Sequence, residues 1–328
     1  MALTLHILGS SAATPTRERN LSSMAIRYRN KILLFDCGED FQRRFAEAGL
    51  KFNKPLMIFI SHFHGDHIIG LPGFLFRLSL NDRTAPIVIF GPRNLFLYLF
   101  LHKKILGLKA NYPIKIYEID YLTEELIEFE GLDSEEPRNK IKIQDNIIYD
   151  SKYYIMKYTL VEHSVITYAY AFIEKPRFGK FDPERVKALG IPESPLWKKL
   201  QEGKIVKHQG KKIDPVKEGI IGPKKPGRKI TYSGDLIPGK SLIELGKNSD
   251  ILVHEATFAK KLADTALEKK HSTSIDAALD AKEMNAKQLI LTHISSRYQE
   301  DAIKLLKEAR EIFPNTILAE DLLKIELK

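Results

Sequence analysis

Several features that would assign a protein to a particular class are missing from this sequence. Its 328 residues contain one cysteine, Cys37, so no disulfide can form within the chain, and we predict a small buried residue in a reducing compartment. No apolar run approaches the roughly 20 residues that span a bilayer, and no basic segment precedes the short apolar stretch at the start. We therefore expect a cytoplasmic protein without a membrane partner.

Acidic residues are scarce in one segment. Residues 175–229 hold 16 Lys and Arg against six Asp and Glu, a net charge of +10, whereas the rest of the chain sums to −1. The segment is also rich in Pro and Gly, with one short helix expected near 194–201. From charge alone two interpretations stay open, a solvated lysine-rich surface or a phosphate-binding arm that displaces the counterions of nucleic acid. In either case we expect an insertion that projects from the core.

Strand and helix patterns alternate on both sides of this segment. The predicted strands are 3–8, 23–28, 31–36, 56–60, 87–90, 230–233, 251–254 and 288–292. The predicted helices are 40–48, 70–80, 94–103, 274–283 and 299–313, the last with Ile303, Leu306, Ala309 and Phe313 on its apolar face. This content predicts an α/β protein in which two sheets pack together with helices outside, as one domain over residues 1–328.

The strongest functional signal is Ser61-His62-Phe63-His64-Gly65-Asp66-His67, in the loop expected directly after an apolar strand. These three histidines and one aspartate would be costly to bury together without a cation. His62 and His64 can face one metal, while Asp66 and His67 face a second. Imidazole nitrogen and carboxylate oxygen suit zinc, so the motif predicts a two-metal centre.

This His-x-His-x-Asp-His pattern resembles that of the metallo-β-lactamase superfamily, which implies an αββα sandwich with two Zn²⁺ per subunit. Further candidate ligands stand at the ends of expected strands. The resemblance implies that His62, His64 and His163 hold one zinc, that Asp66, His67 and His293 hold the other, and that Asp235 bridges them. Zinc lowers the pKa of bound water to about 7, so a bridging hydroxide is the expected nucleophile. Asp66 would orient or deprotonate it.

A second group of segments narrows the resemblance. These are His254-Glu-Ala-Thr-Phe258, Lys270-His-Ser-Thr-Ser274, Phe35-Asp-Cys-Gly38, 67–73 and 294–298. Together they closely resemble ribonuclease Z, the tRNA 3′ endonuclease, and the similarity runs over nearly the whole chain. Two segments depart from the family pattern, Gly38-Glu-Asp-Phe-Gln42 and Ser194-Pro-Leu196, but neither contains a proposed metal ligand.

The ribonuclease Z resemblance also implies roles for residues near the metals. His271, oriented by Glu255, would protonate the departing 3′ oxygen. Asp36 would steady the histidine loop from outside the metal ligands. His254 either does likewise or is a packed histidine at a strand end. The spacing of Thr273 and Asp276 is that of a capping box, which predicts a helix start there and leaves His271 in the preceding loop.

Contacts with RNA follow from the same resemblance. The family carries an arm that grips the tRNA elbow, and residues 175–229 lie where that arm belongs. Precursor tRNA is the implied substrate, bound by a homodimer in which the arm of one subunit presents tRNA to the site of the other. The candidate contact residues are Lys198, Lys199, Lys204 and Lys207 in the arm, Arg17, Arg19 and Asn20 near the start, and Arg297 and Tyr298 near the end.

We therefore predict an endoribonuclease that removes the 3′ trailer of precursor tRNA, leaving a 3′-OH on the tRNA and a 5′-phosphate on the trailer. One alternative is a small-molecule phosphodiesterase or arylsulfatase-like hydrolase, which shares every metal ligand but has no use for a basic arm. A second is a non-catalytic RNA-binding protein with a structural metal pair, against which Glu255 and His271 argue.

Overall fold

The computed structural model describes residues 3–327, which divide into two compact units. Residues 151–154 and 173–228 form the smaller unit, and the rest of the described chain forms the larger one. Among these residues no helix is both long and apolar enough to cross a membrane.

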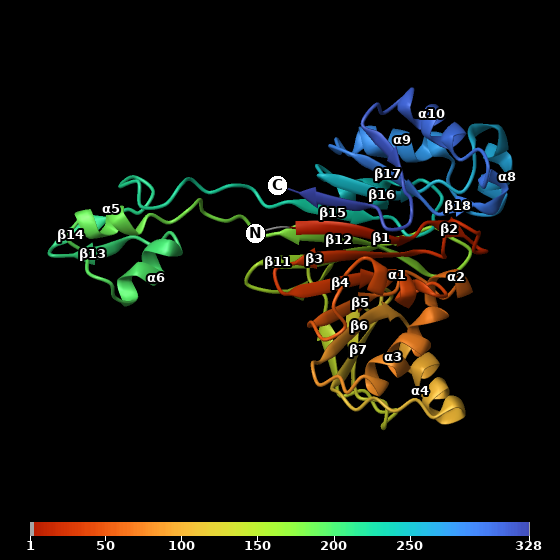
Figure 1. Cartoon of the computed structure of the whole chain (residues 1–328), viewed down its shortest axis with the longest axis horizontal. Coiled ribbons are helices and arrows are strands. Elements are labelled where there is room, and N and C mark those ends of the chain that lie inside the picture. The colour runs from red at the N-terminus through yellow and green to blue at the C-terminus, as the bar shows by residue number, and fades with distance from the viewer. Residues whose placement is uncertain (1–2, 328) are drawn as a thin grey trace. The chain divides into compact units, whose positions relative to one another are not determined.

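Two sheets form the middle of the larger unit (Figure 1). The first runs β20-β1-β3-β4-β5-β6-β7-β8-β9, with β20 (Lys324–Leu327), β1 (Leu3–Gly9), β3 (Ser23–Tyr28), β4 (Lys31–Phe35), β5 (Leu56–Phe59), β6 (Ile87–Pro92), β7 (Ile114–Asp120), β8 (Glu125–Glu130) and β9 (Asn139–Lys142). The second runs β10-β11-β12-β15-β16-β17-β19, with β10 (Ile147–Asp150), β11 (Tyr154–Val161), β12 (Thr167–Glu174), β15 (Lys229–Tyr232), β16 (Ile251–Glu255), β17 (Leu289–Thr292) and β19 (Thr316–Leu318).

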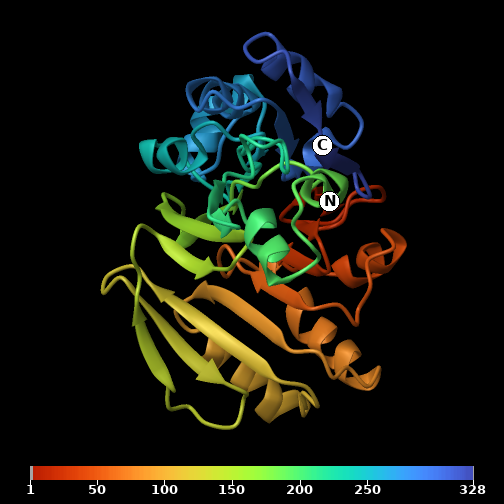
Figure 2. The same ribbon diagram turned by 90° about the vertical axis from the view of Figure 1, so that its left-hand side faces the viewer.

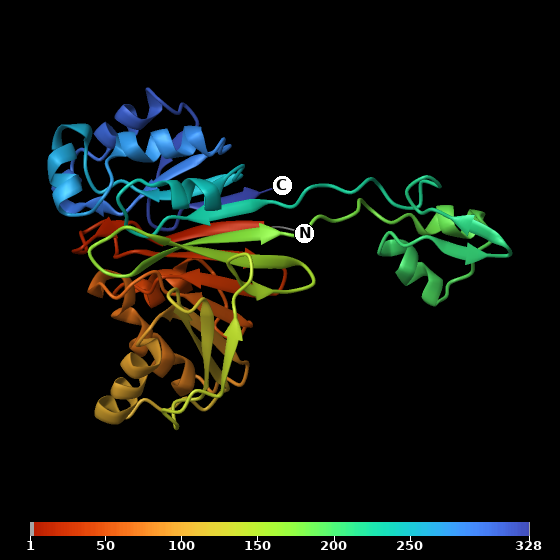
Figure 3. The same ribbon diagram turned by 180° about the vertical axis from the view of Figure 1, so that it is seen from behind.

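Helices cover the outer faces of both sheets, as the views in Figures 2 and 3 also show for the larger unit. On the first sheet lie α1 (Phe41–Glu47), α3 (Gly70–Leu80) and α4 (Leu95–Leu106), and on the second lie α7 (Lys240–Gly246), α9 (Ser274–Glu283) and α10 (Ile303–Arg310). Phe41, Phe74 and Leu99 of the first group bury their side chains in one cluster with Ile58 and Ile116 of the sheet. This arrangement confirms the predicted αββα sandwich.

Aromatic side chains join the inner faces of the two sheets. The ring of Tyr170 in β12 lies 6.2 Å from that of Phe35 in β4 and 5.5 Å from that of Phe59 in β5. Its hydroxyl donates a 2.7 Å hydrogen bond to the carbonyl of Ile60. The contacts hold the ends of β4 and β5 against the second sheet, just before the histidine motif.

Parallel pairing determines where the polar loops meet. β4, β5 and β6 are parallel to one another, as are β15, β16 and β17. The carboxyl ends of parallel strands share one edge of a sheet, and ligands bind at that edge in α/β proteins. A short parallel pair, β2 (Ser11–Ala12) with β18 (Ile294–Ser295), adds two loops from opposite ends of the chain to the same region.

Parts of the sequence prediction differ from the structure. No strand was assigned between residues 104 and 174, where β7 to β12 lie. In this region β9 is fully exposed and β12 is almost fully buried, so neither shows the alternation of a half-buried strand. The helix predicted over 299–313 spans only Ile303–Arg310, preceded by a short 3-10 turn at Ser296–Tyr298. Its buried face contains Leu305, Leu306 and Ala309, while Ile303 is 49% exposed, so the true apolar stripe is rotated from the predicted one.

The smaller unit has its own apolar cluster. It contains α5 (Pro183–Ala188), α6 (Pro195–Gln201) and the hairpin β13 (Val206–His208) with β14 (Lys211–Ile213). Asp182 caps α5 by accepting hydrogen bonds from the backbone of Glu184 and Arg185. The buried residues are Val186, Ile191, Leu200, Val206, Ile213, Ile220 and Ile221. The predicted helix near 194–201 is confirmed, whereas α5 and the hairpin were not anticipated.

Candidate metal centre

The seven predicted metal ligands all stand where strands end or just beyond. His62 and His64 follow β5, and Asp66 and His67 lie in the first turn of α2 (Gly65–Ile68). This short helix replaces the loop expected there. The others, His163, Asp235 and His293, follow β11, β15 and β17. Residues up to 231 positions apart therefore meet at one edge of the sandwich.

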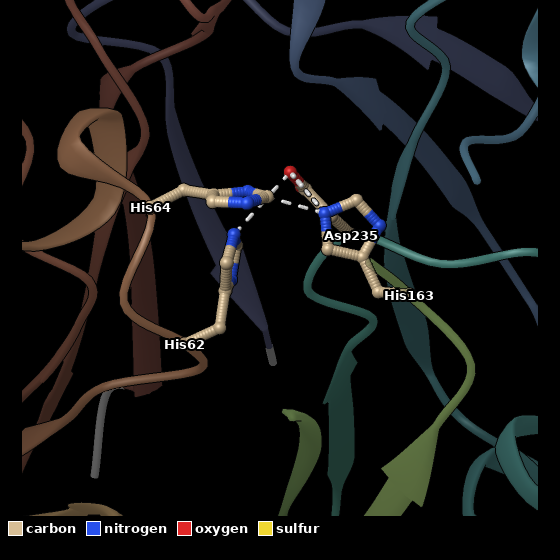
Figure 4. A group of neighbouring side chains, drawn as sticks. All are labelled: His62, His64, His163 and Asp235. Atoms are coloured by element: carbon tan, nitrogen blue, oxygen red, sulfur yellow. Dashed lines mark hydrogen bonds and ion pairs between the residues drawn. The ribbon is translucent and has the colours of Figure 1, made fainter. Parts of the chain in front are cut away.

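The first cluster contains His62, His64, His163 and Asp235, whose ligand atoms all lie within 4.8 Å of one another (Figure 4). His163 Nε2 is 3.2 Å from His64 Nδ1, and His62 Nε2 is 3.6 Å from Asp235 Oδ2. His62 Nε2 is buried and has no hydrogen-bond partner among the described residues. Ligands of a tetrahedral zinc at 2.0–2.1 Å are roughly 3.3 Å apart, so the donor set fits such an ion.

The second cluster contains Asp66, His67 and His293. His67 Nε2 and His293 Nε2 are 3.2 Å apart, and His293 Nε2 is 3.3 Å from Asp66 Oδ2. Asp235 Oδ2 lies 3.3 Å from the Nε2 atoms of both His67 and His293. Because the same oxygen also faces His62, Asp235 occupies the position between the two clusters.

The histidine nitrogens that face away from the clusters are held by hydrogen bonds, as is usual for metal-binding imidazoles. His163 Nδ1 donates to the carbonyl of Lys270 at 2.7 Å. His67 Nδ1 donates to Asp36 Oδ2 at 2.8 Å, and His62 Nδ1 lies 2.9 Å from Ser61 Oγ. Each of these bonds sets the orientation of a ring.

Asp36 is the anchor of this outer network. Its side chain is fully buried and accepts hydrogen bonds from Ser61 Oγ and Tyr232 Oη, both at 2.7 Å, besides that from His67. Its φ of 55° is in the left-handed region, as is the φ of His293, also 55°. Such backbone conformations in non-glycine residues are often found at functional sites. The structure thus places Asp36 where the sequence resemblance implied.

Two of the candidate ligands, Asp66 and His62, are held in the protonation states that bind a metal. Burial would raise the pKa of Asp66, but its hydrogen bond with His293 and the neighbouring His67 hold that pKa below its usual value. Burial holds the pKa of His62 well below its usual value, so its imidazole stays neutral. A neutral imidazole and an ionised carboxylate are the forms that bind a metal.

A histidine and a glutamate lie beside the metal ligands. His271 Nδ1 donates to Glu255 Oε1 at 2.9 Å and is 4.0 Å from Asp235 Oδ2. Burial would lower the pKa of His271, but Glu255 and then Asp235 raise it to about 9. The buried carboxylate of Glu255 is fixed in turn by the backbone N–H groups of Leu236 and Ser272, both at 3.1 Å. The pair therefore presents a protonated imidazole to the site.

The backbone before α9 positions His271. Thr273 and Asp276 form the predicted capping box, which is confirmed, and His271 lies in the loop before the helix. His254 is placed differently. Its Nδ1 donates to the carbonyl of Glu255 and its Nε2 to Asp280 Oδ2 at 3.2 Å, within α9. Because consecutive strand residues point to opposite faces, Glu255 faces the metal clusters and His254 faces the helix, so His254 is a packed histidine.

A cavity of about 740 Å³ opens over the two clusters. Its lining includes His64, Asp66, Asp235, His271, His293, Thr14, Pro15, Phe258 and Arg297. The guanidinium of Arg297 lies 4.9 Å from the centre of the Phe258 ring. A charged wall of this kind beside the metal ligands suits a phosphate.

The other predicted RNA contacts at this edge have different surroundings. Arg19 donates to Ser10 Oγ at 2.7 Å and to the carbonyl of Ala319, and the backbone N–H of Asn20 donates to Asp321 Oδ2 at 2.8 Å. The buried Tyr298 accepts a hydrogen bond from the N–H of Ala259. These three hold the loops together, and Arg17 is exposed outside the lining of the cavity.

In the smaller unit the four predicted lysines, Lys198, Lys199, Lys204 and Lys207, are all exposed. Lys204 pairs with Glu202 at 2.9 Å. Among residues 3–327 no carboxylate forms an ion pair with the other three, so their charge is open to solvent.

Two residues of the site were not identified from the sequence. The backbone N–H of Ala13, whose φ is 57°, donates to Asp66 Oδ2 at 2.7 Å. Thr257 Oγ1 lies between Glu255 and His293. The role of Ala13 depends on its backbone N–H, which the pattern of side chains in a sequence does not indicate. Thr257 stands two positions after Glu255, on the same side of an extended chain, and that spacing was the available signal.

Comparison with known proteins gives relatives of full length. The chain is 37% identical to a ribonuclease Z of Methanosarcina acetivorans, covering 99% of this chain and 98% of the relative. It is 38% identical to a ribonuclease Z of Archaeoglobus fulgidus, covering 100% and 98%. The family model described as Anti-Pycsar protein Apyc1 matches residues 3–122.

Comparison with solved structures also gives matches over nearly the whole chain. The chain is similar to human tRNase Z, short form, with a TM-score of 0.65, 25% identity and 98% coverage of both chains. It is also similar to the metallo-β-lactamase fold protein YhfI of Bacillus subtilis, with a TM-score of 0.64 and 17% identity, which reflects the fold.

Proposed function

The chain belongs to the ribonuclease Z family, and on that premise we propose that it uses two zinc ions to remove the 3′ trailer of precursor tRNA. Cleavage just after the discriminator nucleotide would leave a 3′-OH on the tRNA and a 5′-phosphate on the trailer. The observation that carries the proposal is the meeting of two ligand clusters, joined by Asp235, beneath a cavity that also contains His271.

The choice of zinc rests on the donor set. The ligands are five imidazole nitrogens and two carboxylates, spaced at 3.2 to 4.0 Å between the atoms that face one another, and this chemistry suits zinc better than magnesium or calcium. When bound, two zinc ions would activate a water molecule and offset charge on the phosphate oxygens. Asp66, fixed by the backbone of Ala13, would orient that water and accept its proton.

His271 and Glu255 supply the acid. An RNA alkoxide leaves poorly unless a proton meets it, and a general acid in position contributes about 10²- to 10⁴-fold. The carboxylate of Glu255 keeps His271 protonated at neutral pH, since the pKa of His271 is raised to about 9. His271 therefore would donate its proton to the departing 3′ oxygen, and Glu255 would hold the ring in place.

Substrate choice is attributed to the basic segment. Lys198, Lys199 and Lys207 expose cationic groups on a unit with its own apolar cluster, which suits recognition of RNA shape and backbone. A small-molecule hydrolase needs no such surface. The family model of the Anti-Pycsar protein covers only residues 3–122, while the ribonuclease Z relatives match through the basic segment as well.

The homodimer is also a proposal, and α4 supports it. Leu97, Leu101 and Ile105 form a stripe along this helix and are 43%, 46% and 76% exposed, with Leu106 at 58%. Soluble monomers rarely expose a continuous apolar patch, and a twofold axis lets one such stripe pack on its copy. Leu101→Glu with Ile105→Glu is expected to convert dimers to monomers in analytical ultracentrifugation, and unchanged dimers would assign the interface elsewhere.

The cytoplasmic location stays a prediction that rests on the single cysteine.

The test of the function is a cleavage assay with mapped product ends. Purified protein loaded with zinc is given a tRNA that carries a 3′ extension, and the same protein is given a chromogenic phosphodiester. Cleavage after the discriminator nucleotide with a 3′-OH product is the expected result. Efficient diester hydrolysis without tRNA cleavage would favour the small-molecule alternative, and RNA binding with neither reaction would favour the non-catalytic one.

A further inference from the structure

A basic cavity lies at the end of the first sheet opposite to the metal centre. Its volume is about 520 Å³, and it is bounded by the β3–β4 hairpin and by the segment between α1 and β5. β4 begins at Lys31 beside this cavity and ends at Phe35, one residue before Asp36 of the metal centre. At about 3.3 Å per residue the two sites are roughly 15 Å apart along the strand. The cavity is therefore separate from the catalytic one.

All the charged side chains that line the cavity are basic. The lining consists of Arg27, Arg29, Asn30, Lys31, Ile32, Gly49, Leu50, Lys51 and Lys54, with no acidic residue. Within residues 3–327 no carboxylate forms an ion pair with Arg27, Lys51 or Lys54. Glu47, at the end of α1 next to the cavity segment, is paired with Arg43 and Arg44. Arg27, Lys51 and Lys54 therefore line one concave space without a carboxylate paired to any of the three.

A neighbouring group responds to this charge. His6 in β1 is 3% exposed, and its pKa is lowered to about 4 by burial, then by Arg27 and Lys324. His6 therefore stays neutral at physiological pH and adds no charge of its own. The positive potential at this end of the sheet belongs to the arginine and lysine side chains.

Hydrogen bonds hold the walls of the cavity in place. Arg83 is almost fully buried and donates to the carbonyls of Phe52 and Lys54, the latter at 2.9 Å, which fixes the segment that carries Lys51 and Lys54. The N–H of Ile32 donates to the carbonyl of Pro55 at 3.0 Å and ties that segment to β4. A site that is already ordered loses little conformational entropy when a ligand binds.

The floor differs chemically from the rim. Ile32 and Leu50 are buried apolar residues, 2% and 3% exposed, while Arg27, Lys51 and Lys54 are exposed. The cavity volume of about 520 Å³ lies within the 300 to 1,000 Å³ range of small-molecule pockets. A single RNA strand instead binds along an extended basic groove that has aromatic side chains for base stacking, and the lining of this cavity contains no aromatic residue.

We propose that this cavity binds a small molecule that carries a diphosphate group. Its phosphates lie against Arg27, Lys51 and Lys54. Guanidinium and ammonium groups are the usual partners of phosphate oxygens. The cavity is separate from the metal centre, so failure of this proposal would leave the proposed nuclease function unaffected.

The proposal is tested by calorimetric titration of the zinc-loaded protein with ADP, with pyrophosphate and adenosine as fragments. The metal centre also accepts phosphate groups, so the informative quantity is the binding component that Lys51→Glu with Lys54→Glu removes. We expect ADP to show such a component, weakened at least tenfold in this variant. Pyrophosphate should retain part of it and adenosine none.

Two further variants test whether the lost binding component belongs to this cavity. Lys282→Glu with Lys307→Glu makes the same charge change on exposed residues of α9 and α10 and should leave the ADP component unchanged. Asn30→Trp fills the cavity from its own lining and should abolish the component without any change of charge. Hydrolysis of a chromogenic diester by the two double variants should stay within about twofold of the unmodified protein, which shows that each has folded.

Two outcomes would overturn the proposal. One is an ADP isotherm that neither the charge reversal nor Asn30→Trp alters. The other is a variant at Lys51 and Lys54 that shows no lost ADP component but a raised KM for precursor tRNA, which would make the cavity an RNA contact.

Discussion

The hydroxyl oxygen of Thr257 lies 2.8 Å from Nδ1 of His293. The same hydroxyl donates to Glu255 Oε2 at 2.6 Å, so it accepts the N–H of His293. One short side chain thus connects a candidate metal ligand with the carboxylate that holds His271. Disturbing this link should affect both metal binding and proton donation.

Thr257→Val keeps the shape of the side chain and removes both hydrogen bonds. Loss of an outer partner of a metal-bound histidine costs about 10- to 100-fold in metal affinity or activity, and we expect a loss in that range for zinc measured by chelator competition. Thr257→Ser retains the hydroxyl and should stay close to the unmodified protein. Equal zinc affinity in the valine and serine variants would remove Thr257 from this role.

The Glu255–His271 pair predicts a change in pH dependence. Glu255 raises the pKa of His271, and a general acid works only below its pKa, so activity should fall as pH rises through the pKa that His271 has in the zinc-loaded protein. Glu255→Gln removes the charge that opposes burial, so the pKa of His271 falls and the alkaline limb of kcat moves to lower pH. Bound metal lowers the pKa in both proteins, so the difference between their profiles is the measured quantity.

His271→Ala is the companion variant. It should lower kcat by about 10²- to 10⁴-fold while the protein retains two zinc ions. A profile that keeps its alkaline limb in this variant would assign that limb to another group.

The basic segment should act on substrate binding alone. Reversing the charges of Lys198, Lys199 and Lys207 is expected to raise KM for precursor tRNA by at least tenfold and to make cleavage less sensitive to salt, because fewer counterions are released. Hydrolysis of a chromogenic diester should not change. Removing residues 180 to 225 should give the same separation, and loss of both activities would mean that the segment is needed for folding.

The matched control for the charge reversal is Lys247→Glu, Lys282→Glu and Lys307→Glu, three exposed positions in the larger unit. It makes the same change in net charge. If its KM for precursor tRNA rises as much as that of the Lys198, Lys199 and Lys207 variant, the effect is one of overall charge, and the basic segment has no special role in RNA binding.

Some residues of the candidate site could be predicted from the sequence alone, and others could not. The four ligands between His62 and His67 share one short motif, so their proximity follows from chain geometry. His163, Asp235 and His293 come together only through the pairing of distant strands, and the family resemblance supplied them. The roles of Ala13 and Arg19 were not predictable, because a backbone donor and a bond to the carbonyl of Ala319 depend on tertiary contacts.

Prediction of the fold likewise succeeded for some segments and failed for others. Buried parallel strands such as Leu56–Phe59 have continuous apolar runs and were placed correctly. The strands between residues 104 and 174 include Asn139–Lys142, whose four residues are all exposed, so hydrophobic periodicity gives no signal there. The face of α10 was misjudged because Leu305 and Leu306 are adjacent, which leaves two registers of the apolar stripe almost equivalent in the sequence.

Metal content should depend on the position of each ligand. Asp235 lies between the clusters, so Asp235→Ala should lose both zinc ions, whereas His163→Ala removes a ligand of one cluster and should retain about one. Metal bound after gel filtration, measured by plasma mass spectrometry, distinguishes these results. Two ions retained in Asp235→Ala would contradict the bridging position.

The two arginines Arg19 and Arg297 should behave in opposite ways. Arg297 lines the cavity above the clusters, so Arg297→Ala should raise KM for precursor tRNA with little change in stability. Arg19 instead donates to Ser10 and to the carbonyl of Ala319, and its removal leaves that carbonyl without this donor at a cost of about 1–3 kcal/mol. Arg19→Ala should therefore unfold at lower denaturant concentration. Arg17→Ala, at an exposed neighbouring position, is the control, and a raised KM with unchanged stability in Arg19→Ala would return Arg19 to the substrate-binding group.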